Sequence, residues 1–294
     1  MSQYDYFQPE SLEEAFRLKK EIPNSLFISG GTDLMVRINK REIHPHALIS
    51  LRSIPALSGV ENGKIILIGG MTSISDILKN SLLHEKYPVL IQAAKALGNE
   101  QIRNVATIGG NLCNGSPAAD MAPPLLVLEA KVQLQSTQDS RDLTLEKFFR
   151  GSGETYLSRD ELLTGILLDP TGSNTKTIFL KKGRTKMDLA VASVATLIRA
   201  EGNKCLKARV AAGSVAPTPL RLFEVEALLE GSTLTQDLLN EAQQLAAKSV
   251  SPISDIRSTS DNRRHLVGVL VKRALESLLT GESGDKEFRD RYRT

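Results

Sequence analysis

The stretch that decides the fold of this chain is QIRNVATIGGNLCNGSPAAD, residues 101–120. At its centre, Gly109 and Gly110 directly follow a short apolar run. Because glycine has no Cβ, an anion can approach such a turn closely and accept hydrogen bonds from several backbone N–H groups. Each bond to a charged acceptor contributes roughly 1.5–3 kcal/mol. The pair therefore predicts a phosphate-binding turn, although an ordinary strand-end turn is the alternative for one glycine pair alone.

A second glycine pair repeats the pattern in LFISGGTDL, residues 26–34, where Gly30 and Gly31 close another apolar run. Thr32 beside this pair and Thr107 beside the other add hydroxyl donors. Two such turns that converge on one pyrophosphate predict a dinucleotide site without a lysine clamp. No G-x-G-x-x-G run after a strand, phosphate-loop motif or G-x-S-x-G motif is found, so a Rossmann site, an NTPase and a hydrolase are not supported.

The composition is typical of a globular protein that stays inside the cell. The 294 residues are 41% hydrophobic, which is enough for two or three domains. No apolar run approaches the ~18 residues that cross a bilayer, and the polar start lacks a secretory signal. We therefore expect a cytoplasmic protein without a membrane span. The formal net charge is only +3, from 37 basic and 34 acidic residues, which argues against a nucleic-acid partner.

Cysteine and histidine usage argues against a metal site in this chain. The two cysteines, Cys113 and Cys205, cannot supply the four thiolates that an iron–sulfur cluster normally requires. We interpret Cys113 as a small packing residue, with a redox role as the alternative. The four histidines show no metal-ligand spacing apart from His44-Pro45-His46, which a polar loop explains. We therefore predict no metal ligands.

Residues 101–120 closely resemble the flavin loop of the FAD-binding subunits of molybdenum hydroxylases. That family includes xanthine dehydrogenase, carbon monoxide dehydrogenase and nicotinate dehydrogenase. Further resemblances lie in residues 27–34, in MDLAVA at 187–192 with Arg184 before it, and in SPISDIR at 251–257 followed by Arg263-Arg264. The sequence departs from the family at Asn262, where an aromatic residue is common.

The resemblance implies an α+β fold with two domains. Residues 1–170 would form a two-part FAD-binding domain of the PCMH type, in which a small β-α-β subdomain (about 1–55) precedes a larger mixed α/β subdomain (56–170). Residues 175–294 would form an α+β C-terminal domain with a three-stranded antiparallel sheet and helices. The polar stretch DPTGSN, residues 169–174, is the predicted linker.

Capping and periodicity predict the local structure of both halves. Ser11, with Glu14 three residues later, has the form of a capping box and predicts a helix over 11–20. Hydrophobic patterns predict strands at 26–29, 47–51, 64–68 and 131–135, helices at 72–80 and 88–97, and an apolar segment at 122–129. In the second half they predict a hairpin of 192–199 and 205–212, and helices at 221–230, 235–248 and 261–279. From Gly281 onward we expect a loose tail, with a partner-docking arm as the alternative.

The resemblance also implies which residues hold FAD. The two glycine loops would wrap the pyrophosphate, and Asp120 would accept a hydrogen bond from a cofactor hydroxyl. Leu97 and Leu163 would be apolar contacts to the flavin, with a plain core position as the alternative, and Lys181 would lie beside the flavin. No catalytic residue is predicted in this chain. The predicted FAD-binding residues are Ile28, Ser29, Gly30, Gly31, Thr32, Asp33, Leu34, Leu97, Thr107, Ile108, Gly109, Gly110, Asn111, Ser116, Asp120, Leu163 and Lys181.

By the same resemblance, the chain is the oxidoreductase subunit that passes electrons out of a molybdenum hydroxylase. Its partners would be a small subunit with 2Fe–2S clusters and a large molybdopterin subunit, in a hetero-oligomer that we expect to be a dimer of heterotrimers. NAD, ferredoxin, a quinone and oxygen stay open as acceptors, and the organic substrate stays open too. Two alternatives remain: a self-contained NADPH-dependent reductase of the UDP-N-acetylenolpyruvylglucosamine reductase type, and a flavin-free assembly scaffold.

Overall fold

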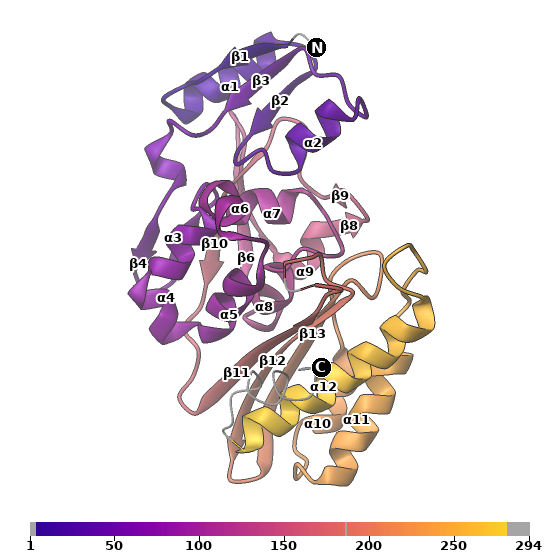
Figure 1. The fold of residues 1–294 in the computed structure, drawn as a ribbon. Helices are drawn as coiled ribbons and strands as arrows, with labels where there is room; N and C mark the ends of the chain where they lie inside the picture. Colours follow the sequence, from indigo (N-terminus) through magenta and orange to yellow (C-terminus); the bar gives the residue numbers. More distant parts are fainter. Residues whose placement is uncertain (1–3, 186, 281–294) are drawn as a thin grey trace. The chain divides into compact units, whose positions relative to one another are not determined.

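A computed structural model describes residues 4–185 and 187–280 (Figure 1). They form two compact units, and the chain passes between them more than once. The first unit comprises the chain up to Asn80 with Gly98–Gly115 and Ala130–Pro170, and the second comprises Ser81–Leu97, Ser116–Glu129 and the chain from Thr171. None of the helices in the described ranges is both long and apolar enough to cross a membrane. The expected tail from Gly281 lies outside the described residues.

A small parallel sheet opens the first unit, and it confirms the predicted strand–helix–strand pattern. Its strands β1 (Asp5–Phe7), β2 (Ser25–Ile28) and β3 (Ala47–Ser50) lie in the order β1-β3-β2. Helix α1 (Leu12–Glu21) starts as the capping box predicts, because the Ser11 hydroxyl accepts a hydrogen bond from the Glu14 amide at 3.2 Å. Helix α2 (Leu34–Asn39) follows the first glycine pair directly.

The rest of the first unit is built on a five-stranded antiparallel sheet in the order β4-β5-β10-β6-β7. The central strand β10 (Leu162–Leu168) is buried along nearly its whole length, so it supplies a rigid platform. The other strands are β4 (Val60–Asn62), β5 (Ile66–Gly69), β6 (Lys131–Gln135) and β7 (Ser140–Thr144), with a separate pair β8 (Phe149–Gly151) and β9 (Glu154–Thr155). Short helices accompany it: η1 (Pro55–Leu57), α3 (Ile74–Lys79), α6 (Glu100–Val105), α7 (Ile108–Cys113) and α9 (Leu145–Phe148).

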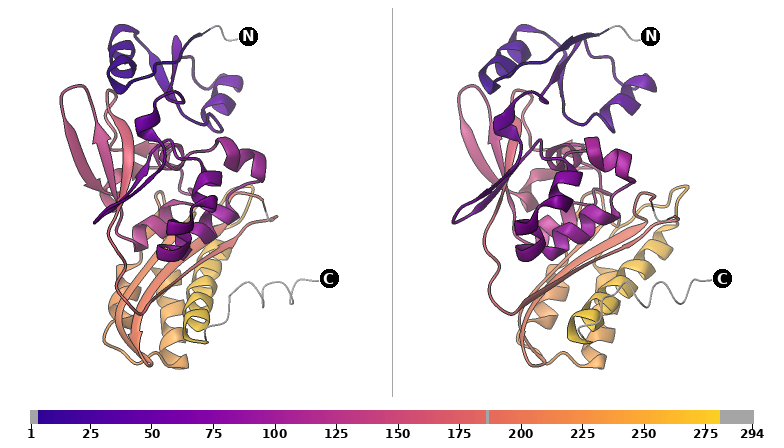
Figure 2. Two further views of the ribbon diagram at one scale, coloured as in Figure 1. Left: turned by 90° about the vertical axis from the view of Figure 1, so that its left-hand side faces the viewer. Right: turned by 60° about the vertical axis from the view of Figure 1, so that its left-hand side comes forward.

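The second unit contains an antiparallel sheet with helices on both faces (Figure 2). The predicted hairpin is confirmed as β12 (Ala192–Glu201) and β13 (Lys204–Gly213). Helices α10 (Phe223–Leu229), α11 (Gln236–Lys248) and α12 (Ser260–Thr280) enclose an apolar core with the sheet. Helix α5 (Pro88–Ala96) packs on β11 (Thr175–Lys182), and α8 (Ala122–Val127) packs on β12 and β13, while α4 (Ser81–Lys86) precedes α5.

The α+β fold class is confirmed, with one correction to the second sheet. It has four strands rather than three, because β14 (Leu220–Arg221) pairs with β13. A two-residue strand carries no alternation of apolar and polar residues, so the hydrophobic pattern cannot predict it. The pairing aligns Ala212 with Leu220.

The second glycine pair does not form the predicted turn. Gly109 and Gly110 lie in the first turn of α7, where the Thr107 hydroxyl accepts a hydrogen bond from the Gly110 amide at 3.0 Å. Glycine has a low intrinsic helix propensity, and for this reason the glycine pair predicts a turn. Here the cap and the complete burial of Ile108 and Leu112 stabilise the helix instead.

Candidate functional site

The two predicted glycine pairs lie against one another in the first unit. A Cβ added at Gly110 would lie 2.7 Å from Ser29 Oγ, in the first glycine loop. A Cβ added at Gly30 would overlap the carbonyl oxygen of Val105, at the end of α6. Gly30 therefore requires glycine, because backbone lies too close for a side chain, whereas a side chain at Gly110 would displace the hydroxyl groups of Ser29 and Thr107. The structure brings together the two segments that the sequence predicts to share one ligand.

The first glycine loop offers free backbone donors. Gly31 has a φ of +71°, which reverses the chain between β2 and α2. Within the described ranges, the amides of Gly30, Gly31, Thr32 and Asp33 donate hydrogen bonds to no protein group. Successive free N–H groups around a left-handed residue form a concave anion site. This loop thus has the chemistry of a pyrophosphate cradle.

The amides of the second glycine pair already donate to acceptors within the protein. The Gly109 amide donates to the Gly70 carbonyl at 2.9 Å, and the Gly110 amide donates to Thr107 Oγ1 at 3.0 Å. A Cβ at Gly109 would lie 2.6 Å from Gly70 O. Gly69 and Gly70 form a third glycine pair after an apolar strand, LIGG, which the sequence reasoning missed although it shows the same pattern.

A cavity of about 600 Å³ adjoins these glycines within the first unit. Ser29, Gly109, Gly110 and Leu163 from the predicted set line it. Side chains absent from that set complete the walls: Lys19, Phe27, Leu51, Met71, Cys113, Leu157, Arg159, Glu161 and Leu162 are among them. A volume of this size is typical of pockets for small molecules and cofactors.

The thiol of Cys113, which lines this cavity, is unreactive. Burial raises the pKa of its thiol to about 12, so the group is protonated at neutral pH. A protonated thiol is neither a nucleophile nor a metal ligand. No cluster of three or more metal-ligating side chains occurs in residues 4–185 or 187–280.

Asp120 and Lys181 form a buried ion pair in the second unit. Lys181 Nζ lies 2.6 Å from Asp120 Oδ2 and donates to the Ala96 carbonyl at 3.1 Å. The two side chains are 5% and 7% exposed, respectively. Burial raises the pKa of Asp120 to about 6, and this effect outweighs the opposing charge and hydrogen bond of Lys181. Oδ1 of the same carboxylate is buried and has no hydrogen-bond partner in the described part of the chain.

The predicted site residues thus fall into two sets, one in each unit. The first unit holds Leu163 and both glycine segments, residues 28–34 and 107–111, although Ile108 is fully buried beneath the loop. The second unit holds Asp120 and Lys181 together with Leu97 and Ser116. Leu97 is 7% exposed at the end of α5, and the Ser116 hydroxyl accepts a hydrogen bond from the Ala118 amide at 3.2 Å.

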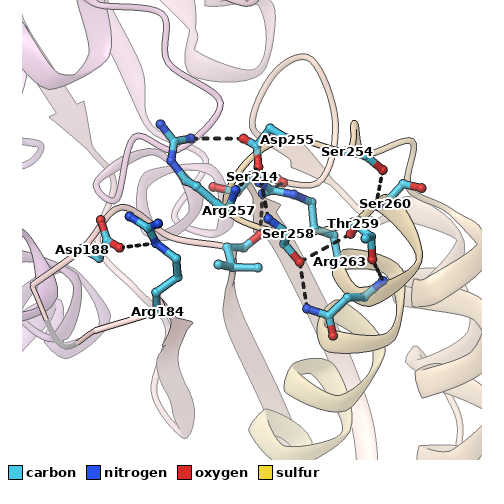
Figure 3. A network of polar contacts seen from close by, with 12 residues as sticks. Arg184, Asp188, Ser214, Ser254, Asp255, Arg257, Ser258, Thr259, Ser260 and Arg263 are labelled. Atoms are coloured by element: carbon cyan, nitrogen blue, oxygen red, sulfur yellow. Dashed lines mark hydrogen bonds and ion pairs between the residues drawn. The ribbon is translucent and has the colours of Figure 1, made fainter.

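A second polar network orders loops of the C-terminal half (Figure 3). Asp255 Oδ1 accepts hydrogen bonds from the Arg257 amide at 2.9 Å and from Arg263 Nη2 at 2.8 Å. Arg263 is 3% exposed and also donates to the carbonyl oxygens of Val191 and Ser214, at 2.7 and 3.0 Å. One buried guanidinium on α12 therefore fixes three separate loop segments.

These loops carry apolar side chains that face water. Ile256 is 94% exposed and Ile253 is 70% exposed, while Met187 and Leu189 are 63% and 47% exposed. The hydrogen bond from Arg184 lowers the pKa of Asp188, and the charge of Arg257 on the other loop adds to this effect. Arg184 also pairs with Asp188, at 2.8 Å (Figure 3). Four large apolar side chains are thus exposed on two loops that Arg263 helps to order.

Comparison with known proteins assigns the family. The model of the FAD binding domain in molybdopterin dehydrogenase matches residues 2–170, and that of the CO dehydrogenase flavoprotein C-terminal domain matches residues 178–278. The chain belongs to the family of FAD-binding subunits of molybdenum hydroxylases.

Individual relatives are similar to this chain along nearly their whole length. The glyceraldehyde dehydrogenase medium chain of Sulfolobus acidocaldarius is 33% identical, over 94% of this chain and 98% of the relative. The xanthine dehydrogenase FAD-binding subunit of Escherichia coli O157:H7 is 27% identical, over 95% and 97%. A solved chain of carbon monoxide dehydrogenase from Hydrogenophaga pseudoflava superposes with a TM-score of 0.92 at 30% identity, over 95% of this chain and 98% of that one.

FAD is the cofactor of this flavin subunit, and the chemistry of both residue sets fits it. Four free amides at residues 30–33 match the anionic oxygens of a pyrophosphate. The unpartnered Asp120 Oδ1 matches a hydroxyl donor, because a buried acceptor without a hydrogen bond costs free energy until a ligand satisfies it. Ser29, Gly109 and Gly110 line the cavity beside these amides, and a Cβ added at Gly110 would press on Ser29 Oγ.

Proposed function

We propose that this chain is the electron outlet of a molybdenum hydroxylase. It would receive electrons from the 2Fe–2S clusters of a partner subunit and pass them to an external acceptor such as NAD, in the cytoplasm. Bound FAD would supply the redox centre, which this chain's side chains lack. The row of free amides beside the second glycine pair is the observation that carries the proposal.

We propose that both residue sets hold this FAD. The first loop would bind the pyrophosphate through its amides, the second pair would leave room for it, and Asp120 would accept a hydroxyl. Lys181 would act mainly through Asp120, since its ammonium is already bound to that carboxylate. In this proposal residues 1–170 are the FAD-binding domain and residues 175–294 are the C-terminal domain.

A spectrum of the purified protein tests FAD binding most directly. We expect one FAD per chain, bound non-covalently, because neither glycine segment contains a histidine that could attach the ring. Acid precipitation should release all of the flavin into the supernatant. A colourless protein that takes up no FAD on titration would favour the assembly scaffold and contradict the proposal.

A second test separates the electron outlet from a self-contained reductase. Isolated and free of molybdenum, the chain should oxidise no organic substrate, while its flavin still exchanges electrons with artificial donors. The control is the intact complex from the native host, which should turn over. Substrate-dependent bleaching of the flavin in the isolated chain would instead favour the independent flavoenzyme.

We also propose that the C-terminal domain forms part of the docking surface for the partner subunits. The exposed Ile256 and Ile253 lie on a turn that Asp255 holds rigid, which reduces the entropy lost on binding. We expect the small 2Fe–2S subunit and the large molybdopterin subunit to copurify with a tagged chain, as a dimer of heterotrimers. Ile256→Asp should weaken this copurification, whereas Phe223→Asp, on the exposed side of α10, is the matched control. A tagged chain that elutes alone under gentle conditions would refute the partnership.

A further inference from the structure

One wall of the cavity in the first unit is a short segment, residues 156–161, between β9 and β10. Leu157, Ser158, Arg159 and Glu161 from this segment line the cavity. It has no regular secondary structure. One backbone hydrogen bond, from the Tyr156 amide to the Phe148 carbonyl at 2.8 Å, ties its first residue to the rest of the unit, so the remainder depends on side-chain contacts.

Arg141, which lies outside the cavity, supplies side-chain contacts at both ends of the segment. Arg141, on the edge strand β7, donates from Nε to Glu161 Oε1 at 2.6 Å and from Nη2 to Oε2 at 2.8 Å. The same Nη2 donates to the Tyr156 carbonyl at 3.0 Å. Arg141 therefore binds both ends of the segment, in the two-pronged geometry that gives the strongest carboxylate pairing. Arg141 is not among the residues that line the cavity.

Glu161 is held as a carboxylate for this purpose. Its Oε2 also accepts a hydrogen bond from the Ser158 amide at 2.7 Å. The hydrogen bonds from Arg141 lower the pKa of Glu161 to about 2, against the opposing effect of burial. The ion pair thus persists at every pH at which the protein is expected to work.

The side of the segment that faces the cavity carries a positive charge without a paired carboxylate. Arg159 and Lys19 both line the cavity, Arg159 from the segment and Lys19 from α1 across it. In residues 4–185 and 187–280, Arg159 has no carboxylate within ion-pairing distance. Its charge adds to burial in lowering the pKa of Lys19. An empty cavity therefore places two cations near each other, whereas an anionic ligand between them would relieve the repulsion.

We propose that residues 156–161 form a retaining wall for FAD, and that Arg141 is the positioning residue that latches this wall from outside through Glu161. The proposal rests on the proposed placement of FAD at the glycine loops. Three of their residues, Ser29, Gly109 and Gly110, line the same cavity, as does Leu163. The bonds of Arg141 hold the wall in place against the repulsion between Arg159 and Lys19. A bound anion would reduce this repulsion and so stabilise the wall further. Loss of the latch should shorten the time that FAD stays bound without changing its contacts.

The test measures FAD release from the full-length, FAD-loaded chain. After dilution, the rise of free-FAD fluorescence gives the release rate for wild type, Arg141→Met and the matched control Arg150→Met. Arg150 is an exposed arginine of β8 with no part in the latch. We expect release about fivefold faster from Arg141→Met, as for the loss of a partly exposed ion pair of good geometry, and an unchanged rate from Arg150→Met. The double variant Arg141→Met with Glu161→Gln should be no faster than Arg141→Met alone.

A second readout follows the wall itself. Trypsin cuts after Arg159, so cleavage at this bond reports how often the wall opens. In the FAD-free chain Arg141→Met should be cut faster than wild type, and added FAD should protect both. Release of FAD from Arg141→Met at the wild-type rate overturns the latch, while the flavin-subunit proposal stands. A wild-type chain that takes up no FAD overturns both.

Discussion

Lys181 Nζ lies 2.6 Å from Asp120 Oδ2, and the other oxygen of this carboxylate has no partner among the described residues. The pair is buried, and the two residues are 61 positions apart in the chain. One oxygen of the carboxylate thus has its partner within the described residues, and the other has none. In the proposed site, Oδ2 of Asp120 has a structural role and Oδ1 is the atom that would bind the cofactor.

Asp120 should make the FAD-free chain less stable as the pH rises. Its folded pKa is about 6, above the ordinary value of 3.8, so the folded chain binds this proton more tightly than the unfolded chain does. The contribution is fully present below about pH 4 and is lost as the pH rises through about 6. Asp120→Asn stays neutral throughout, so its free energy of unfolding should gain roughly 3 kcal/mol relative to wild type between pH 4 and 7. This change adds to a constant cost, because the variant leaves the buried Lys181 ammonium without its carboxylate. Urea unfolding at a series of pH values measures this difference, and a constant difference would contradict it.

Lys181→Met should destabilise the second unit strongly. The change leaves the Asp120 charge buried without its partner, which typically costs about 3–5 kcal/mol. Adding Asp120→Asn should recover much of the loss, because the variant pair no longer contains a buried charge. Lys95→Met is the matched control, since Lys95 is exposed on the neighbouring helix α5. Calorimetric unfolding of wild type, Lys181→Met, the double variant and Lys95→Met measures these stabilities. Equal losses of stability for Lys95→Met and Lys181→Met would exclude a special role for the ion pair.

Gly30→Ala should destabilise the first unit even without FAD. The added Cβ would overlap the Val105 carbonyl, which is backbone and cannot rotate away. Forcing the loop and α6 apart costs roughly 1–3 kcal/mol. The control is Gly172→Ala, where the nearest atom is an arginine nitrogen at 3.5 Å and no change beyond about 0.5 kcal/mol is expected. A thermal midpoint for Gly30→Ala equal to that of wild type would disprove the close approach.

Gly110→Val should abolish FAD binding in a chain that still folds. The new side chain would press on Ser29 Oγ at 2.7 Å and Thr107 Oγ1 at 2.9 Å, which are ends of short side chains that can move. Their displacement fills the space beside the free amides and removes the cap of α7. The ratio of flavin to protein absorbance measures the outcome, with circular dichroism as the folding control. A full flavin complement in the folded variant would show that the pyrophosphate lies elsewhere.

Local signals in the sequence predicted most of the regular structure. The Ser11 capping box, the alternating strand at 131–135 and the hairpin at 192–212 all form as expected, because each depends on residues close together in the chain. The same holds for α11 and α12, which begin and end within two residues of the predicted positions. Elements with weak local signals were missed, such as β14 and α7.

Some features of the candidate site follow from local sequence, and others follow only from tertiary packing. The sequence by itself determined the family and the two glycine segments, because those motifs lie in consecutive residues, and the resemblance to the family implied roles for Asp120 and Lys181. Only the tertiary structure decided that Gly30 approaches Val105 and that Lys181 neutralises Asp120. Such contacts depend on how strands and helices pack, and no local pattern encodes the distance between residues that are tens of positions apart. For the same reason Arg141, 20 positions from Glu161, has no signature in the sequence, although the geometry makes it the residue that holds the cavity wall.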